Sequence, residues 1–460
     1  MENIEVLSAF DQKKIETLPL TSEKEALKIL ETSYSLFKNR KQWIRAEERI
    51  SILNKTADII EQRREALALQ AAQEGGKPLT DSLVEVDRAI NGIKVAIKEL
   101  SHFHGTEIPM NLNKSSANRV AYTRKDPRGV VFAISAFNHP FNLIIHQVIT
   151  AIAVGCPVIV KPARKTPLSC RNLINILYEV GLPKDWCQMI ICKSEVSEKI
   201  VKDKRVSFLT FIGSAKVGWS LRSKLSPGAT CALEHGGVAP AIIDHTADIE
   251  KAIPLLTKGG FHHAGQVCVS VQRIIAHKKI INVLSEKLVE SVKKLKVGDP
   301  TLKETEVGPL ISPKEVDRIH SWVEKAIAGG AKLLCGGEKI SETCYAPTVL
   351  LDPPKDCEVS TNEIFGPVVC LYQYEKLDDA IEQANSLDYA FQASVFSNDL
   401  DVTMKSIENL EGMTIMVNDH TAFRVDWMPF GGYKRSGLGV GGIGHTMKDM
   451  TIEKMFVIKR

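Results

Sequence analysis

The stretch Gly129-Val-Val-Phe-Ala-Ile-Ser135 is an apolar segment of strand length that ends on a polar residue. A helical pattern follows over 141–154, and then a second apolar strand, Pro157-Val-Ile-Val-Lys161. The alternation continues with a helix over 168–180, strands over 189–192 and 208–213, and a helix over 215–225. Apolar strands that alternate with helices are typical of a parallel sheet covered on both faces. The sequence therefore predicts an α/β fold with a doubly wound parallel sheet.

The segments on either side of this sheet predict further structure. Residues 22–104 have helical patterning, which begins at the capping box Ser22-x-x-Glu25. A second alternating segment runs over 239–425 and includes a strand at 393–396, and residues 451–459 resemble a terminal strand. At 460 residues the chain is too long for one compact core, so we expect two or three domains.

Composition and charge exclude several classes of protein. The net charge of +4 is small, and acidic residues are interspersed with the basic ones, which argues against a nucleic-acid surface. The sequence has neither a secretory signal pattern nor an apolar run of about 20 residues, so we expect no membrane contact and a cytoplasmic location. The ten cysteines have no Cys-x-x-Cys spacing, which indicates neither a metal site nor disulfides. Nine of the ten are expected to be small buried hydrophobic residues.

Cys268 is the exception, because it follows the turn Gly265-Gln-Val rather than lying in an apolar string. From this segment alone, a structural cysteine and a nucleophile are equally supported. Glu234 stands before a double glycine, where a carboxylate could activate water against an acyl-enzyme. Asn138 follows the first strand and could donate to an oxyanion, although it could equally be a turn asparagine before Pro140. Each of these signals is weak by itself.

Two further segments could hold a cofactor. Gly213-Ser-Ala-Lys-Val-Gly218 follows a strand and opens a helix, so a phosphate could bind its helix N-terminus, although it matches no standard phosphate motif. Glu363-Ile-Phe-Gly-Pro367 places an acid and an aromatic ring before a rigid turn.

Together these segments resemble the NAD(P)-dependent, non-acylating aldehyde dehydrogenase superfamily over essentially the whole chain. The motifs that match, in the family's order, are Asn138, Lys161-Pro162, Phe211-Ile-Gly-Ser214, Leu233-Glu-His-Gly-Gly237, Gly265-Gln-Val-Cys268, Glu363-Ile-Phe-Gly-Pro367 and Pro429-Phe-Gly-Gly432. The separation of 34 positions between Glu234 and Cys268 is also that of the family.

The resemblance implies catalytic roles for three residues. Cys268 would be the nucleophile that forms a thiohemiacetal and then a thioester. Asn138 and the backbone amide of Cys268 would form the oxyanion hole, and Glu234 would activate water for deacylation. A CoA-acylating enzyme would use a thiol instead of water, and such members commonly lack the base that Glu234 supplies here.

The resemblance also implies a binding site for NAD(P)+, with no metal. Lys161 and Glu363 would hold the two riboses, Phe365 would lie against the nicotinamide, and Ser214 would touch the pyrophosphate. The full set of implied cofactor residues is Ser135, Lys161, Arg164, Gly213, Ser214, Glu363 and Phe365. Arg164 stands where many NAD-dependent members have a glutamate, and an arginine can pair a 2′-phosphate, so we expect NADP+ to be accepted. The alternative is that Arg164 points to solvent.

The substrate pocket is expected to involve Arg88, His139, Phe141, Arg424 and Trp427. The segment 423–429 resembles the branch that handles lactaldehyde, non-phosphorylating glyceraldehyde 3-phosphate and phosphonoacetaldehyde. Potential cations around one pocket predict a short aldehyde with an anionic or hydroxylated tail. Val267 leaves phosphate open, because phosphate-handling members often carry an arginine there.

Two alternative functions are also compatible with the sequence. The pair His262-His263 before the nucleophile would suit a Cys-His hydrolase, and the scaffold could also serve a binding protein without catalysis. The resemblance implies an NAD(P)-binding domain over 1–106 and 128–235, a catalytic domain over 236–425, and a small β extension over 107–127 and 446–460. Residues 426–445 would return to the cofactor domain. The extension would pair residues 118–125 with the C-terminal strand and join subunits into a homodimer or homotetramer.

Overall fold

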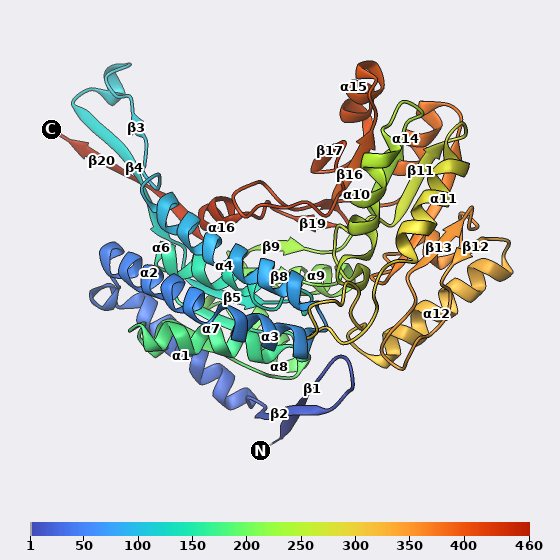
Figure 1. Cartoon of the computed structure of the whole chain (residues 1–460). Coiled ribbons are helices and arrows are strands. Elements are labelled where there is room, and N and C mark those ends of the chain that lie inside the picture. The colour runs from blue at the N-terminus through green and yellow to red at the C-terminus, as the bar shows by residue number, and fades with distance from the viewer. Residues whose placement is uncertain (1) are drawn as a thin grey trace.

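The first half of the chain builds most of a six-stranded sheet in the computed structural model, which describes residues 2–460 (Figure 1). Its order is β19-β9-β8-β5-β6-β7, and the five strands from β9 to β7 run parallel. The strands are β5 (Val130–Ile134), β6 (Val158–Lys161), β7 (Cys187–Met189), β8 (Val206–Ile212), β9 (Thr230–Glu234) and β19 (Gly437–Leu438). The α/β fold with a doubly wound parallel sheet is confirmed.

Helices cover both faces of this sheet. They are α1 (Glu23–Lys38), α2 (Ala46–Gln62), α3 (Arg64–Gly75), α4 (Leu79–Leu100), α5 (Asn142–Ile144), α6 (Thr150–Val154), α7 (Pro167–Glu179), α8 (Ser194–Lys202), α9 (Ala215–Arg222) and α16 (Ile443–Asp449). A π-helical turn, η3 (Ile145–Ile149), joins α5 to α6. The capping box at Ser22 is present, because its backbone N–H donates to Glu25 at 2.8 Å and its hydroxyl accepts from the Glu25 amide.

Two details of this half differ from the sequence-based expectations. The N-terminal hairpin, β1 (Asn3–Leu7) and β2 (Lys14–Pro19), was not predicted, and its buried face packs on Leu168 and Ile191. The strand expected at 189–192 ends at Met189. The prediction was wrong there because the backbone of Ile191 bonds to Thr21 of the N-terminal segment.

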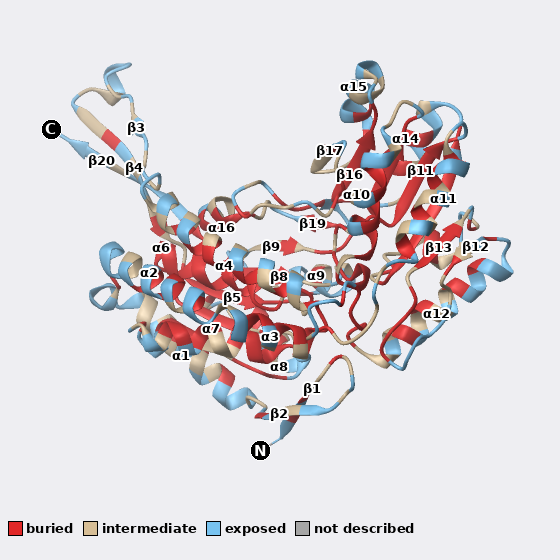
Figure 2. Cartoon of the chain, in the orientation of Figure 1, coloured by how far each residue is buried: buried red, intermediate tan, exposed pale blue. Residues whose placement is uncertain are grey.

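The second large sheet has seven strands in the order β12-β13-β14-β11-β10-β16-β17. They are β10 (Pro240–Ile243), β11 (Arg273–His277), β12 (Lys332–Cys335), β13 (Thr348–Leu351), β14 (Val368–Tyr374), β16 (Gln392–Phe396) and β17 (Thr414–Val417). Its helices are α10 (Ile249–Phe261), α11 (Ile281–Val292), α12 (Pro313–Ala328), α13 (Glu358–Thr361), α14 (Leu377–Asn385) and α15 (Leu400–Asn409). The central strands of both large sheets are buried, while edge strands such as β12 and β17 and the outer faces of the helices are partly exposed (Figure 2).

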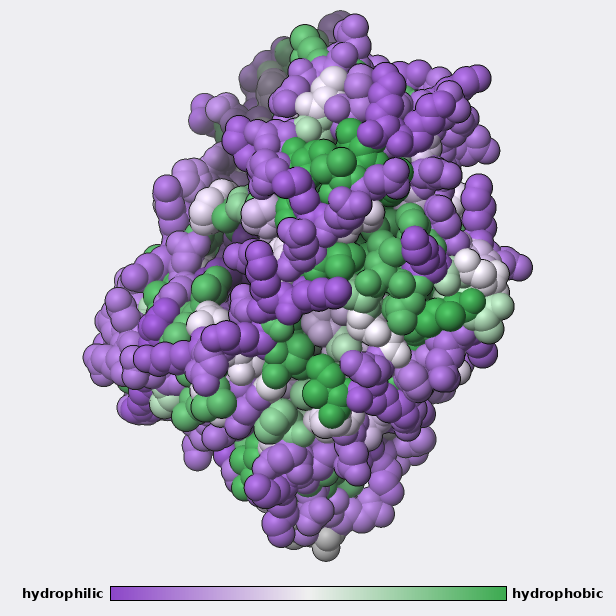
Figure 3. Space-filling view, turned by 45° about the vertical axis from the view of Figure 1, so that its right-hand side comes forward, coloured by the Kyte–Doolittle hydropathy of each residue, from purple (hydrophilic) through white to green (hydrophobic). Residues whose placement is uncertain are grey.

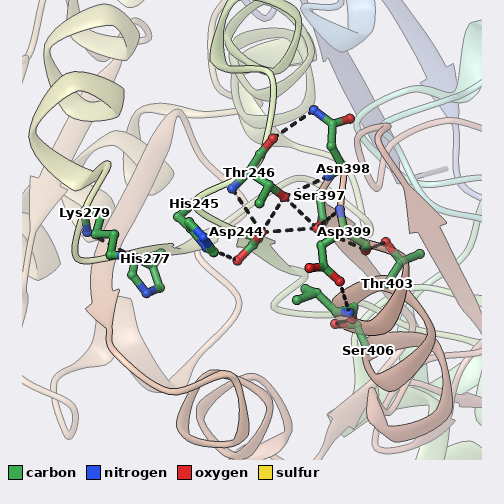
Figure 4. A network of polar contacts seen from close by, with 11 residues as sticks. Asp244, His245, Thr246, His277, Lys279, Ser397, Asn398, Asp399, Thr403 and Ser406 are labelled. Carbon is green, nitrogen blue, oxygen red and sulfur yellow. Dashed lines mark hydrogen bonds and ion pairs between the residues drawn. The ribbon is translucent and has the colours of Figure 1, made fainter.

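The carboxyl ends of β10 and β16 are tied together by polar contacts (Figure 4). The Asp244 carboxylate accepts from the Thr246 hydroxyl at 2.6 Å and from the Ser397 hydroxyl at 3.2 Å. The Asn398 side chain donates to the Thr246 carbonyl at 2.8 Å. Hydrogen bonds therefore join the loop after β10 to the loop after β16 at this end of the second sheet.

A third, smaller sheet projects from the molecule as an arm (Figure 1). It has the order β20-β4-β3, from β3 (Glu107–Ile108), β4 (Arg119–Pro127) and β20 (Thr451–Lys459). The predicted pairing of the C-terminal strand with residues 118–125 is confirmed by a continuous antiparallel register from Thr451↔Pro127 to Lys459↔Arg119. The short elements are η1 (Arg40–Gln42), η2 (Lys114–Ser116), η4 (Lys184–Trp186), η5 (His262–Gly265), β15 (Tyr389–Ala390) and β18 (Tyr433–Lys434).

The face in Figure 3 is mainly hydrophilic, with hydrophobic residues gathered in separate patches through its centre. All ten cysteines are free, and seven are buried. The expectation of nine buried cysteines was wrong for Cys231 and Cys357, which are half-buried. Within residues 2–460, no helix is both long and apolar enough to cross a membrane.

Candidate active site

A cavity of about 520 Å³ lies where the carboxyl ends of β5, β8 and β9 face the loop before β11. This is the edge at which parallel sheets of this kind bind ligands. Most of the predicted site residues line it together: Ser135, Asn138, His139, Gly213, Ser214, Glu234, Cys268, Glu363, Phe365, Arg88 and Arg424. The first sheet thus supplies one wall and the second sheet supplies the thiol.

The loop that carries Cys268 is held in an unusual conformation. Within η5, His263 and Ala264 have φ values of 50° and 53°, and Gly265 follows at 68°, so three consecutive residues are left-handed. A Cβ on Gly265 would lie 2.1 Å from the carbonyl oxygen of Gly366, so only glycine fits. The buried Gln266 side chain then ties the loop to its surroundings, donating to the Pro309 carbonyl at 3.1 Å and accepting from the Ile311 amide at 2.9 Å.

Cys268 is half-buried at the cavity wall. Burial, and then the negative charge of Glu234, raise the pKa of the thiol well above its ordinary value, while Arg424 opposes them. A raised pKa favours the protonated thiol over the thiolate, so a proton must leave Cys268 before its sulfur can attack a carbonyl.

Asn138 directs its amide at the nucleophile loop. Its Nδ2 donates to the Gln266 carbonyl at 2.9 Å, which locks the side chain two residues before Cys268. A primary amide has two N–H donors, so one stays available for an oxygen in the cavity. This geometry suits an oxyanion-hole donor better than a turn asparagine.

Glu234 ends β9, and its backbone carbonyl accepts from the Gly213 amide at 3.0 Å. Its carboxylate lies 3.8 Å from Arg424, whose guanidinium stacks on the Phe430 ring at 3.6 Å. Burial raises the pKa of Glu234, whereas the charges of Arg424 and Arg88 lower it. A carboxylate with a raised pKa is a stronger base near neutral pH than an ordinary glutamate.

The residues expected to hold the cofactor fit a polar ligand. Glu363 Oε1 and Ser135 Oγ are buried and have no hydrogen-bond partner among residues 2–460. Such atoms are costly to bury without a partner, so both indicate an external one. Burial raises the pKa of Glu363 to about 8. A Cβ on Gly236 would lie 1.9 Å from Glu363 Oε1, so the double glycine makes room for this carboxylate.

Lys161 and Arg164 lie just outside the residues that line the cavity. Lys161 ends β6 and is partly buried, and burial lowers the pKa of its ammonium. Arg164 is exposed, and Ala163 between them lines the cavity. Ser214 caps α9 at its N-terminus without a capping bond from its own side chain, which leaves the hydroxyl free for a ligand at that end of the helix.

The five expected substrate residues divide into two groups. Arg88, His139 and Arg424 line the cavity. Phe141 is buried at 1% exposure in the core with Ile144 and Ile145, and Trp427 is 59% exposed. Neither of these two is among the residues that line the cavity. An aromatic residue beside a site motif can be core or surface, and only packing decides which.

Asp426 was missed by the sequence analysis, although it binds Arg88, which lines the cavity. Its buried carboxylate accepts from Arg88 at 2.8 and 3.1 Å, from Asn142 at 3.1 Å, and from His146 at 2.7 Å. Burial alone would raise the pKa of Asp426, but His146 and Arg88 hold it far below its ordinary value. The positive charge of Arg88 is therefore balanced by the carboxylate of Asp426 within the protein. Lys77, Glu85 and Arg318 were also missed, because single charged residues in a helix or loop carry no motif.

The histidine pair does not activate the thiol. His262 lies 3.1 Å from Asp81, and burial lowers the pKa of His263 well below its ordinary value. Within residues 2–460, no hydrogen bond joins either imidazole to Cys268, which a Cys-His dyad would need.

Comparison with known proteins agrees with this geometry. A family model described as the aldehyde dehydrogenase family matches residues 1–456. The chain belongs to the aldehyde dehydrogenase family. It is an NAD(P)-dependent enzyme that oxidises small aldehydes to acids, as the resemblance predicted.

Several relatives cover nearly the whole chain. A 3-sulfolactaldehyde dehydrogenase of Priestia megaterium is 37% identical over 458 residues, which cover 99% of this chain and 95% of the relative. A lactaldehyde dehydrogenase of Methanocaldococcus jannaschii is 35% identical, covering 100% of this chain and 98% of the relative. Among solved structures, the glyceraldehyde-3-phosphate dehydrogenase GapN from Methanocaldococcus jannaschii, complexed with NADP, matches with a TM-score of 0.95 and 34% identity over 100% of both chains. These relatives fall in the branch that the segment 423–429 resembles.

Proposed function

We propose that this aldehyde dehydrogenase oxidises a short aldehyde with a hydroxylated or anionic tail, through an acyl-enzyme on Cys268. The observation that carries the proposal is the meeting of Cys268, Asn138 and Glu234 in one cavity with the cations Arg88 and Arg424. A thiol, an oxyanion donor and a carboxylate base are the three groups that acyl chemistry on cysteine needs.

Each residue has a distinct task in the reaction. The Cys268 thiol gives its proton to water, and the thiolate that results adds to the aldehyde carbon. The free N–H of Asn138 stabilises the oxyanion of the thiohemiacetal. NAD(P)+, when bound, accepts the hydride. Glu234 then takes a proton from a water molecule, which attacks the thioester and releases the acid. Arg424, beside Glu234, holds that carboxylate in place and favours its ionised form.

Replacing Asn138 with alanine should lower kcat by roughly a hundred- to a thousand-fold, because one oxyanion donor is lost in a buried site. Steady-state kinetics would measure this, with Asn54→Ala as the control, since Asn54 is exposed and bonds only to the Ile50 carbonyl of its own helix. A variant that kept wild-type kcat would show that Asn138 serves only to hold the Gln266 loop.

We also propose that Arg164 contacts the 2′-phosphate of NADP+. The residue is exposed beside the cofactor wall, and a guanidinium pairs a phosphate with charge-assisted bonds. Arg164→Glu should raise the KM for NADP+ by about 10- to 100-fold while leaving that for NAD+ within a few-fold, since hydrogen bonds to charged groups contribute about 1.5–3 kcal/mol. The matched control is Lys41→Glu, the same charge reversal at a distant exposed site. Equal changes for both coenzymes would argue that Arg164 points to solvent.

The substrate is tested by following NAD(P)H absorbance with a panel of short aldehydes. Lactaldehyde, 3-sulfolactaldehyde, glyceraldehyde 3-phosphate, phosphonoacetaldehyde and succinate semialdehyde carry an oxygenated or anionic tail, and propanal carries none. We expect the first group to exceed propanal in kcat/KM, because Arg88, His139 and Arg424 all present donors to the cavity. A preference for propanal would contradict the proposed substrate class, and a requirement for CoA would indicate the acylating reaction instead.

We also propose the division into a cofactor domain, a catalytic domain and a β extension, which the six-, seven- and three-stranded sheets support. We propose that the protein is a homodimer or homotetramer, because β20 is an edge strand with exposed Ile452, Met455 and Ile458. Light scattering would measure the mass of the assembly.

The ten free cysteines support a location in a reducing compartment, the cytoplasm.

A further inference from the structure

Lys77 is a buried lysine that the reaction scheme does not use. It lies between α3 and α4 and is 1% exposed. Its ammonium donates to Glu85 Oε2 at 2.8 Å and approaches His139 Nδ1 at 2.6 Å. A buried charge is retained only where its partners compensate it, so the partners of Lys77 are informative.

Glu85 accounts for the charge of this lysine. Its second oxygen, Oε1, accepts from the backbone amides of Phe141 and Asn142, each at 2.9 Å. The carboxylate therefore accepts three hydrogen bonds, two from backbone amides and one from Lys77. The Lys77 ammonium, which this carboxylate pairs at 2.8 Å, has hydrogen-bond donors only.

The ammonium decides which nitrogen of His139 carries a proton. Because an ammonium cannot accept a hydrogen bond, Nδ1 must present its lone pair to Lys77. Burial, and then the charge of Lys77, hold the pKa of His139 well below its ordinary value, so the ring is neutral. A neutral imidazole without a proton on Nδ1 carries it on Nε2.

The ring of His139 is part of the cavity wall, and Nε2 is the ring nitrogen that Lys77 leaves free. His139 lines the cavity with Arg88, Cys268 and Arg424, and its side chain is 16% exposed. Within residues 2–460, the hydrogen bonds of this ring involve Nδ1 only. Its two cationic neighbours already have acidic partners. Arg88 lies 2.8 Å from Asp426, and Arg424 lies 3.8 Å from Glu234. His139 Nε2 is thus a neutral, uncommitted donor at this wall, beside Arg424, whose Nε also has no partner among the described residues.

We propose that Lys77 is a positioning residue for substrate choice, which fixes His139 as the Nε2–H tautomer so that this N–H donates to an oxygen on the substrate's tail. The inference rests on the proposed function and deepens it, because it assigns recognition of a tail oxygen to one atom. A site built to bond a hydroxyl disfavours the analogue that lacks it, since the donor is then left without a partner.

Lactaldehyde and propanal form a matched pair of probes, because both have three carbons and differ by the C2 hydroxyl. The quantity to measure is the ratio of their kcat/KM values. His139→Phe keeps a ring without a donor and should lower this ratio by about tenfold, which is the effect of about 1.4 kcal/mol. His139→Gln places an amide nitrogen near the position of Nε2 and should recover most of the ratio.

Lys77 is tested by the double variant Lys77→Met/Glu85→Gln, which removes both buried charges and leaves neither unpaired. The glutamine can still accept from the amides of Phe141 and Asn142. We expect the ratio to fall several-fold, mainly through the KM for lactaldehyde, because both tautomers of His139 become accessible. The control is Lys325→Met/Glu358→Gln, which removes an exposed pair 2.6 Å apart.

The tautomer itself is measured by NMR on protein with ¹⁵N-labelled histidine, with the His139 signals identified by their loss in His139→Gln. We expect an unprotonated Nδ1 and a protonated Nε2 in the wild type, and a mixture in the Lys77 double variant. A proton on Nδ1 in the wild type, or an unchanged substrate ratio in His139→Phe, would overturn the inference. If the wild type oxidised neither aldehyde, the proposed substrate class would fail, whereas the NMR result would still decide the role of Lys77.

Discussion

Cys268→Ala should abolish aldehyde-dependent reduction of NAD(P)+, with a loss of at least about 10,000-fold, since a covalent pathway has no substitute once its nucleophile is removed. The cavity would keep its cofactor wall, because Ser135, Ser214 and Glu363 are contributed by other segments. Cofactor binding, followed by fluorescence titration, should therefore stay within a few-fold of the wild type. Steady-state absorbance with the preferred aldehyde would measure the loss of turnover.

The matched control is Cys231→Ala, which removes a second half-buried thiol in β9, outside the cavity lining. Its turnover should equal that of the wild type. Residual turnover above about 1% in Cys268→Ala would mean that another group attacks the aldehyde, and the acyl-enzyme scheme would then be wrong.

Glu234→Gln should leave acylation largely intact and slow the release of the acid by roughly 100- to 10,000-fold, the range for loss of a general base. The expected result is a rapid burst of one NAD(P)H per site, followed by a slow steady state. Mass spectrometry of the quenched variant should show the acyl group on Cys268. Glu304→Gln, at an exposed position, is the control.

The pH dependence of kcat tests the same residue. Burial raises the pKa of Glu234, and only its ionised form accepts a proton from water. Turnover in the wild type should therefore rise with pH through a pKa above that of an ordinary glutamate. The Gln variant should lose this limb, and Arg424→Met should move it to higher pH, because Arg424 lowers the pKa of Glu234. A limb that persisted in Glu234→Gln would assign the titration to another group.

The sequence could predict the main sheet because its strands are short apolar runs between amphipathic helices. Residues 130–134, 158–161 and 206–212 are almost entirely buried, so their pattern is continuous rather than alternating. The N-terminal hairpin escaped prediction, since β1 and β2 are stable only against Leu168 and Ile191, which are distant in sequence. The end of β7 was misplaced for the same reason.

Within the site, the sequence by itself determined which chemical groups are present: a thiol, an amide and a carboxylate. Cys268, Asn138 and Glu234 each lie in a short motif of neighbouring residues, so a linear pattern can contain them. Tertiary structure alone decided the environment of these groups. Asp426 meets Arg88 across 338 positions, Lys77 meets His139 across 62, and Phe141 turns into the core. Ionisation, tautomer and substrate choice depend on such long-range contacts and on burial, because the electrostatic energy of a group is set by what surrounds it in space.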